Sequence, residues 1–153
     1  MKRKALAVAA GLTLVTAGVL AQQKTDTMMH GPAVRVAELK GRGMYAKLTG
    51  TAVIVLLSDG THRVFVQADG LPENQVALAN HIHYNAAGNA SCNDQNGDKI
   101  VGLAAIRSDA KGAGLASTSL PADTRYPGGT TYINIHAGNE VIACGQVVAA
   151  AAP

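Results

Sequence analysis

Polar and apolar residues alternate along residues 80–84, as expected for a half-buried β-strand. Side chains of a strand point to opposite faces in turn, so His81 and His83 fall on one predicted face and Ile82 on the other. The backbone of a strand therefore fixes the spacing between the two imidazoles.

A second alternating stretch, residues 132–136, predicts a strand with Ile133 and Ile135 on its apolar face. Its polar face carries His136 together with a tyrosine and an asparagine. If the two strands are neighbours, all three imidazoles meet on one polar patch. Three neutral imidazoles suit copper, zinc or nickel, and the affinity order among these ions favours Cu(II). The alternative is a set of surface histidines that binds no metal.

The remaining chain after residue 32 consists of short alternating or β-branched runs, separated by turn-forming residues and without a helical period. This pattern predicts one all-β domain over residues 33–149, an antiparallel sandwich or barrel of about eight strands. With one Phe and no Trp, its core must come from Val, Ile, Leu and Ala. The expected strands are residues 33–48 with a turn or bulge at 41–43, and residues 51–57, 62–68, 75–84, 100–106, 113–120, 130–136 and 141–149.

The first 21 residues predict a signal peptide, because three basic residues at positions 2–4 precede an apolar run that ends near Ala21. The alternative is a retained membrane anchor, although the run is short and broken by glycine and threonine. Cleavage after Ala21 would deliver the protein to the periplasm, the cell envelope or the medium. Residues 22–32 predict a disordered arm, and residues 150–153 a short tail.

The predicted arm contains Met28, Met29 and His30, which are either soft and imidazole ligands for copper or part of a tail left by processing. The charge balance also depends on the signal peptide. The chain has 13 basic and 10 acidic residues, and three of the basic ones lie in residues 1–21. The processed chain is thus electrically balanced, so neither nucleic acid nor a membrane surface is an expected partner.

Two cysteines, Cys92 and Cys144, lie in this predicted exported chain. A single structural disulfide is the expected state in an oxidising compartment. Two free thiols and two further metal ligands are the alternatives. Residues 85–98, which contain Cys92, are rich in Asn, Gly and Asp and predict a surface loop.

Five short segments of the chain stand out together: Gly70-Leu71, His81-Ile82-His83, Cys92, Ile135-His136-Ala137-Gly138 and Ala143-Cys144-Gly145. They resemble the copper/zinc superoxide dismutase family, and the similarity covers roughly residues 51–148. The resemblance implies an eight-stranded Greek-key β-barrel, a disulfide between the two cysteines, and copper held outside the barrel. By motif position, His81, His83 and His136 resemble three of the four copper ligands of that family.

The sequence departs from the family at the rest of the site. No His follows Cys92 at the position of the bridging ligand, and residues 97–106 lack counterparts of the zinc ligands. Residues 137–140 replace a long loop, and Val141 stands where the family has its active-site arginine. Arg125 could substitute for that arginine from its loop. We therefore expect one copper per chain, no zinc, and weakened catalysis or none.

The sequence thus supports an exported copper protein of the superoxide dismutase type, with superoxide as its small-molecule substrate if it is active. A copper-binding or copper-buffering module without turnover is the first alternative. A structural β-sandwich that has lost activity is the second. The fourth copper ligand (His30, His62, water or none) and the oligomeric state are left open by the sequence.

Overall fold

The computed structural model describes residues 33–75, 77–124 and 130–150. The predicted signal peptide and arm, Arg125, and the last three residues lie outside this described part. Within it, the chain is all-β, as predicted, apart from one short 3-10 helix. The elements are β1 (Ala33–Gly41), η1 (Gly43–Tyr45), β2 (Thr49–Leu56), β3 (His62–Asp69), β4 (Ala79–Tyr84), β5 (Lys99–Gly102), β6 (Arg107–Ser108), β7 (Gly114–Leu120), β8 (Thr131–Ala137) and β9 (Glu140–Ala149).

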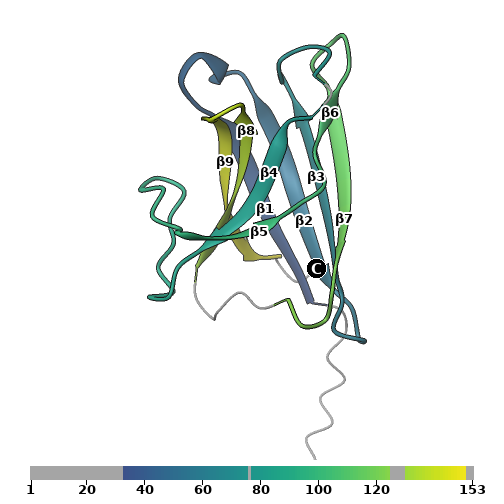
Figure 1. Cartoon of the computed structure of the whole chain (residues 1–153), viewed down its shortest axis with the longest axis vertical. Coiled ribbons are helices and arrows are strands. Elements are labelled where there is room, and N and C mark those ends of the chain that lie inside the picture. The colour runs from purple at the N-terminus through teal and green to yellow at the C-terminus, as the bar shows by residue number, and fades with distance from the viewer. Residues whose placement is uncertain (1–32, 76, 125–129, 151–153) are drawn as a thin grey trace, which may run out of the picture.

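The strands form one antiparallel sheet in the order β5-β4-β8-β9-β1-β2-β3-β7-β6. The sheet curls into a barrel, and its two end strands belong to one continuous piece of chain that crosses the barrel (Figure 1). A bridge between Leu78 and Ile106 joins the two sides. The predicted antiparallel β-barrel is therefore confirmed.

The sequence predicted one strand over residues 100–106. The structure instead has β5 at 99–102 and β6 at 107–108, so the barrel has nine strands instead of eight. The cause is a change of partner along this segment. The Leu103 amide donates to the Asn80 carbonyl on β4, whereas the Ala104 amide donates to Thr118 Oγ1 on β7. A strand that leaves one neighbour for another cannot keep a continuous ladder of backbone hydrogen bonds.

The core fills the inside of the barrel with aliphatic side chains. Val64 and Val66 point inward from β3, as their alternation predicts, and Ile82, Ile133 and Ile135 point inward from β4 and β8. Full burial of one such side chain stabilises the fold by about 1.5–3 kcal/mol. The inward isoleucines leave the neighbouring residues of β4 and β8 on the outer face of the barrel.

A two-residue turn, Gly138-Asn139, connects β8 to β9, at the place where the sequence predicted a short hairpin. Gly138 has a φ of 59°, which a two-residue hairpin requires at its first position and which glycine adopts without strain. The predicted disulfide between Cys92 and Cys144 is present, with an S–S distance of 2.04 Å. It ties residues 85–98 to the outer face of β9.

Candidate metal centre

The pairing of β4 with β8 brings the three predicted histidines to one face. In the register of this pair, His81 lies opposite Asn134 and His83 opposite Tyr132, while His136 lies opposite Ala79. An irregularity between Ile135 and His136 in the β8–β9 ladder precedes the last of these residues. The predicted parity of both strands is therefore correct, and their adjacency, on which the sequence argument depended, is observed.

The three imidazoles form one compact group on the outside of the barrel. The ring centroid of His81 is 5.8 Å from that of His83 and 5.1 Å from that of His136. The centroids of His83 and His136 are 6.2 Å apart. One nitrogen from each ring lies within 4.8 Å of the other two. In the described part of the chain, this is the group of three or more His, Cys, Asp or Glu side chains that could hold a metal ion.

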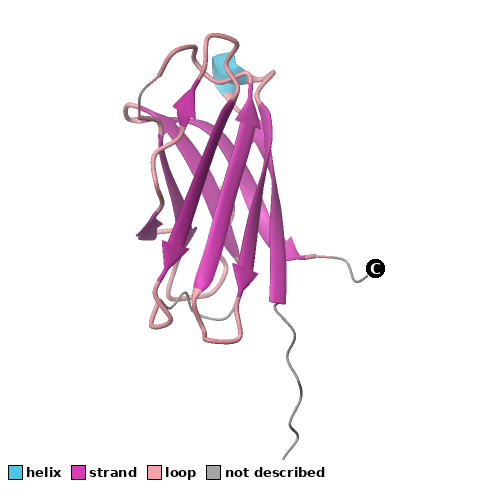
Figure 2. Ribbon diagram, turned by 90° about the vertical axis from the view of Figure 1, so that its right-hand side faces the viewer, coloured by secondary structure: helices cyan, strands magenta, loops and turns pink. Residues whose placement is uncertain are grey.

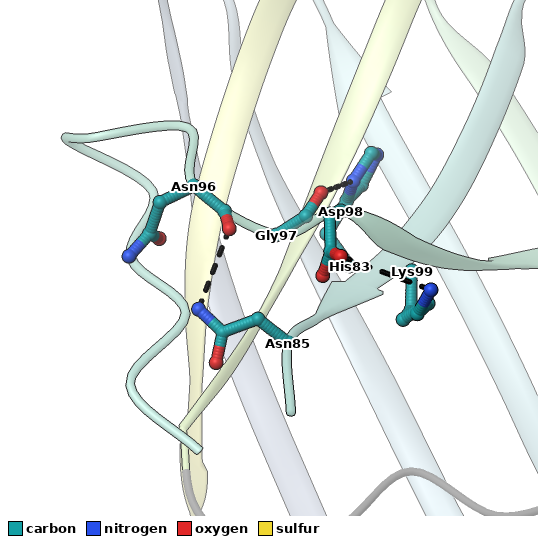
Figure 3. Close-up of polar contacts among 6 residues, drawn as sticks. All are labelled: His83, Asn85, Asn96, Gly97, Asp98 and Lys99. Atoms are coloured by element: carbon teal, nitrogen blue, oxygen red, sulfur yellow. Dashed lines mark hydrogen bonds and ion pairs between the residues drawn. The ribbon is translucent and has the colours of Figure 1, made fainter. Parts of the chain in front are cut away.

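The loop before β5 fixes the orientation of the His83 ring. Nδ1 of His83 lies 3.1 Å from the Gly97 carbonyl oxygen, a contact drawn in Figure 3. An N–H at Nδ1 that donates to this carbonyl leaves Nε2 as the nitrogen with a free lone pair. One face of the His83 ring stacks on the Tyr132 ring, with ring centroids 5.0 Å apart and ring planes within 1° of parallel. The Gly97 amide donates to the Tyr132 hydroxyl at 3.1 Å, so one residue positions both rings.

Gly97 has this role because it has no side chain. A Cβ at this position would lie 2.8 Å from the Cβ of His83 and 3.1 Å from the Tyr132 ring. Gly102, which pairs with His81 on β5, is the opposite case, because a Cβ there would meet nothing within 4 Å. The centre is therefore tightly enclosed on the Gly97 side and open on the Gly102 side.

Two ring nitrogens at the centre are buried without a hydrogen-bond partner. These are Nε2 of His83 and Nε2 of His136. Buried polar atoms without a partner are uncommon, since each costs about 1–3 kcal/mol. A transition-metal ion bound by lone pairs on these nitrogens would remove that cost, and neutral imidazole is a good ligand for copper and zinc. The residues therefore fit a metal ion.

Burial also favours the neutral rings that metal binding requires. The pKa of His136 is lowered from its ordinary value, first by burial and then by the neighbouring His81 and His83. The pKa of His81 is lowered by burial and by His83. Protons therefore compete less with a metal ion at these two rings than at exposed histidines.

A second polar network lies beside the histidines and had no counterpart in the sequence analysis. The Gln95 side chain donates to the Cys92 carbonyl and lies 3.3 Å from Cys144 Sγ. Its Oε1 accepts a 2.7 Å hydrogen bond from Nδ2 of Asn134, which is fully buried and opposite His81. Gln95 thus connects the disulfide to the strand that carries His136.

Arg42 reaches the same network from the end of β1. Its Nη1 donates to the Cys92 carbonyl at 2.7 Å, so Arg42 and Gln95 share one acceptor. Its charge also acts on Tyr132: burial raises the pKa of the Tyr132 hydroxyl, while the Gly97 amide and Arg42 oppose that rise. The Arg42 charge therefore acts on the hydroxyl of the ring on which His83 stacks.

Other residues considered from sequence lie elsewhere. His62 is on β3, separated from β8 in the sheet by β9, β1 and β2, and it is not in the histidine group. Burial and Arg35 lower its pKa. His30 and Arg125 lie outside the described residues. The helix η1 is a single turn. No helix among the described residues is long and apolar enough to cross a membrane.

No protein-family model and no curated protein sequence matches the chain. Among solved structures, the chain is similar to a single-substitution variant of superoxide dismutase 5 from Candida albicans, at 18% sequence identity and a TM-score of 0.52. The match covers 80% of this chain and 94% of that one. Strand arrangement and chain coverage together show that this protein has the superoxide dismutase-like β-barrel fold.

Proposed function

We propose that this protein is an exported copper protein of the superoxide dismutase type, with one copper ion held by His81, His83 and His136. The observation that carries the proposal is the pair of buried, unpartnered Nε2 atoms on His83 and His136, within 4.8 Å of a ligand atom on His81. The superoxide dismutase-like fold supports it, as does the strand geometry that preorganises the three ligands.

Copper, when bound, supplies the one-electron redox chemistry that superoxide dismutation requires. The chain's own residues set the conditions for it. A proton at Nδ1 of His83 would be donated to the Gly97 carbonyl, which leaves Nε2 as the ligand atom. The Tyr132 ring covers one face of His83 and excludes water from it. The missing side chain at Gly102 leaves an entry path for a small anion beside His81.

Arg42 is the residue that we propose to attract the anion. Val141 occupies the position of the family's active-site arginine, so β9 supplies no cation there. The Arg42 guanidinium approaches from η1's side of the barrel and is fixed by the Cys92 carbonyl. A fixed positive charge near a site raises the local concentration of anions, and salt screens this effect.

Export is part of the same proposal. The predicted signal peptide supports it, and so does the disulfide between Cys92 and Cys144, a type of bond that persists in oxidising compartments. A copper-binding or copper-buffering role without turnover is the second candidate. The position of the Arg42 guanidinium favours this second role. The Cys92 carbonyl holds it beside the disulfide, and not on β9 next to His136.

Copper titration of the purified chain tests the proposal. We expect one tightly bound Cu(II) per chain, and a loss of affinity of at least about 100-fold in each of His81→Ala, His83→Ala and His136→Ala. His62→Ala is the matched control and should bind like the wild type. Unchanged affinity in all three site variants would eliminate the metal centre.

Superoxide turnover then separates the two candidates. The assay uses chain of measured copper content, so that activity is expressed per bound copper. Activity that falls with ionic strength and that drops in Arg42→Ala more than in Arg42→Lys supports dismutation at this site. One bound copper per chain, with no superoxide turnover above that of free copper, would support the binding or buffering role instead of dismutation.

A further inference from the structure

Asn134 is a buried amide on the same face of the barrel as the three histidines. It lies on β8, two residues before His136, and opposite His81 on β4. Residues two apart on a strand share a face, and directly opposed residues have Cβ atoms about 4.5–5.5 Å apart. Asn134 therefore borders two of the three residues that could hold the metal ion.

The cover over Asn134 comes from the loop of residues 85–98. Asn134 is 1% exposed, although it belongs to the outer face of the sheet. The single helical turn of the described chain lies at one end of the barrel (Figure 2). The loop reaches Asn134 through Gln95, and the disulfide ties this loop to β9. Asn134 is thus shut off from bulk water at the border of the metal centre.

A chain of hydrogen bonds fixes which end of the Asn134 amide faces the loop. The Cys92 carbonyl can only accept, so the Gln95 side chain turns its nitrogen toward it. The oxygen of Gln95 then faces Asn134, and Nδ2 of Asn134 donates to it at 2.7 Å. Both donors and acceptors of this chain are matched, which leaves Oδ1 of Asn134 on the other end of the amide.

The free end of the amide turns toward the histidine strand. Gln95 approaches from the β9 side, since its Nε2 lies 3.3 Å from Sγ of Cys144, the β9 residue opposite Asn134. Nδ2 of Asn134 is therefore directed toward β9. The nitrogen and oxygen of an amide lie on opposite sides of its carbon, so Oδ1 is directed toward β4, which carries His81 opposite Asn134.

Buried polar atoms without a partner are concentrated on this face. Among the described residues, four buried side-chain nitrogen or oxygen atoms have no hydrogen-bond partner. Three of them are Oδ1 of Asn134 and the Nε2 atoms of His83 and His136. The fourth is on Asn80, which precedes His81 on β4 and so belongs to the opposite face. Native proteins rarely leave such atoms unpaired, and three on one small face indicate a common ligand set.

We propose that Asn134 is a positioning residue, whose Oδ1 accepts a hydrogen bond from a small ligand at the metal centre, water in the resting protein. This inference rests on the proposed copper site and identifies the residue that selects its remaining ligand. Metal sites with three protein ligands keep a further position for water or substrate. An amide oxygen accepts and cannot donate, so it favours a ligand that carries a proton over a bare anion. Superoxide must displace this water, and Asn134 thus sets how readily an anion enters.

Azide binding to the copper-loaded full chain tests this inference, because azide is a bare anion that competes with water for Cu(II). Asn134→Leu keeps much of the side-chain bulk and removes Oδ1, so azide affinity should rise by about 5- to 10-fold. Gln95→Met is the matched control, since it breaks the same Gln95–Asn134 hydrogen bond and retains Oδ1. Its azide affinity should stay within about 2-fold of the wild-type value.

The relaxation of solvent water protons by bound Cu(II) is the second measurement. The wild type should show the enhancement that an exchanging water ligand produces, and Asn134→Leu a weaker one. If Asn134→Leu does not load copper, the double variant Asn134→Leu/Gln95→Met carries the same test, because it leaves neither partner of their hydrogen bond unpaired.

Copper content is measured first, so that two kinds of failure are separated. Azide affinity that is unchanged without Oδ1, or that shifts equally in Gln95→Met, overturns the role of Asn134 and leaves the copper site standing. A wild-type chain that binds copper without a water ligand does the same. A wild-type chain that binds no copper overturns this inference together with the proposed function.

Discussion

The imidazole of His83 lies flat against the phenol ring of Tyr132, with ring planes within 1° and centroids 5.0 Å apart. The two residues face each other across the β4–β8 pair, and the Gly97 peptide bonds to both through its carbonyl and its amide. The ligand, the ring that supports it and the loop above it therefore form one unit.

Substitutions at Tyr132 can separate the contribution of the stacked ring from that of the hydroxyl that accepts the Gly97 amide. Tyr132→Phe keeps the stacked ring and removes the acceptor of the Gly97 amide, so we expect a loss of about 1 kcal/mol in stability and a modest loss of copper affinity. Tyr132→Leu removes the ring as well, and the resulting gap should cost about 3 kcal/mol. Denaturant unfolding and copper titration of the two variants provide the measurement. Equal copper affinities in both would show that stacking does not position His83.

Substitutions of two glycines near the centre should have contrasting effects. Gly97→Ala inserts a methyl group 2.8 Å from the Cβ of His83, which must move, so copper affinity should fall by about 10-fold or more. Gly102→Ala is the matched control, since its added methyl group meets nothing within 4 Å. Copper titration of the wild type and the two variants in parallel measures the three affinities. A copper affinity that changes equally in both would contradict the tight enclosure at Gly97.

The pKa values of His81 and His136 predict a pH dependence for the metal-free chain. Both pKa values lie below the ordinary 6.5 in the folded state, so the unfolded chain binds more protons below pH 6.5. The free energy of unfolding should therefore be flat above this pH and fall as the pH drops below it. Unfolding of His136→Gln between about pH 7 and about pH 5 should show a smaller slope than the wild type. Identical slopes would mean that His136 titrates as an exposed residue.

Gln95 combines a strained backbone with a bonded side chain. Its φ is 53°, in the left-handed region that costs a non-glycine residue about 1 kcal/mol. Gln95→Ala keeps this cost and leaves Asn134 Nδ2 without its partner, so we expect a loss of about 2 kcal/mol in stability. Gln95→Gly relieves the backbone and should be the milder change by roughly 1 kcal/mol. If chemical denaturation ranked the two variants in the reverse order, backbone strain at Gln95 would be excluded.

Metal loading should discriminate between copper and zinc. The sequence places no second set of zinc ligands after Cys92, and the described chain supplies one histidine group. After exposure to both ions and dialysis against a chelator, we expect about one copper per chain and no retained zinc. Metal analysis of the wild type and of His136→Ala gives the stoichiometry and its dependence on the site. A chelator-resistant zinc at full occupancy would refute this expectation.

The features that the sequence predicted correctly are those with a short repeat along the chain. The parity of His81, His83 and His136 follows from the alternation of side chains in a strand, and the buried isoleucines between them confirm it. The turns around Gly60 and Gly138 have glycines with positive φ, as hairpin connections require. Local conformation decides such features, so local sequence carries them.

The contacts that complete the centre have no such signature. Gln95 and Gly97 lie in a loop that the sequence showed only as turn-forming. Several of their partners are distant in sequence: Tyr132 is 35 residues from Gly97, and Cys144 is 49 residues from Gln95. Arg42 acts through a carbonyl 50 residues distant. The change of strand partner near Leu103 also depends on the hydrogen bond from the Leu103 amide to the Asn80 carbonyl, and no periodic pattern in the sequence indicates that bond. These features arise from tertiary packing, which overrides the local pattern.

The position of the β8–β9 hairpin in the sheet has a consequence for the order of assembly. Among the described strands these two come last in chain order, yet they lie between β4 and β1 in the sheet. The ladders that join β4 to β1 on this side of the barrel run through them. While residues 131–149 of a growing chain are still inside the ribosome, the folding part lacks His136. It also lacks β9, which carries the disulfide partner of Cys92. The barrel therefore closes only after residues 131–149 have left the ribosome, because its non-local pairings cannot form earlier.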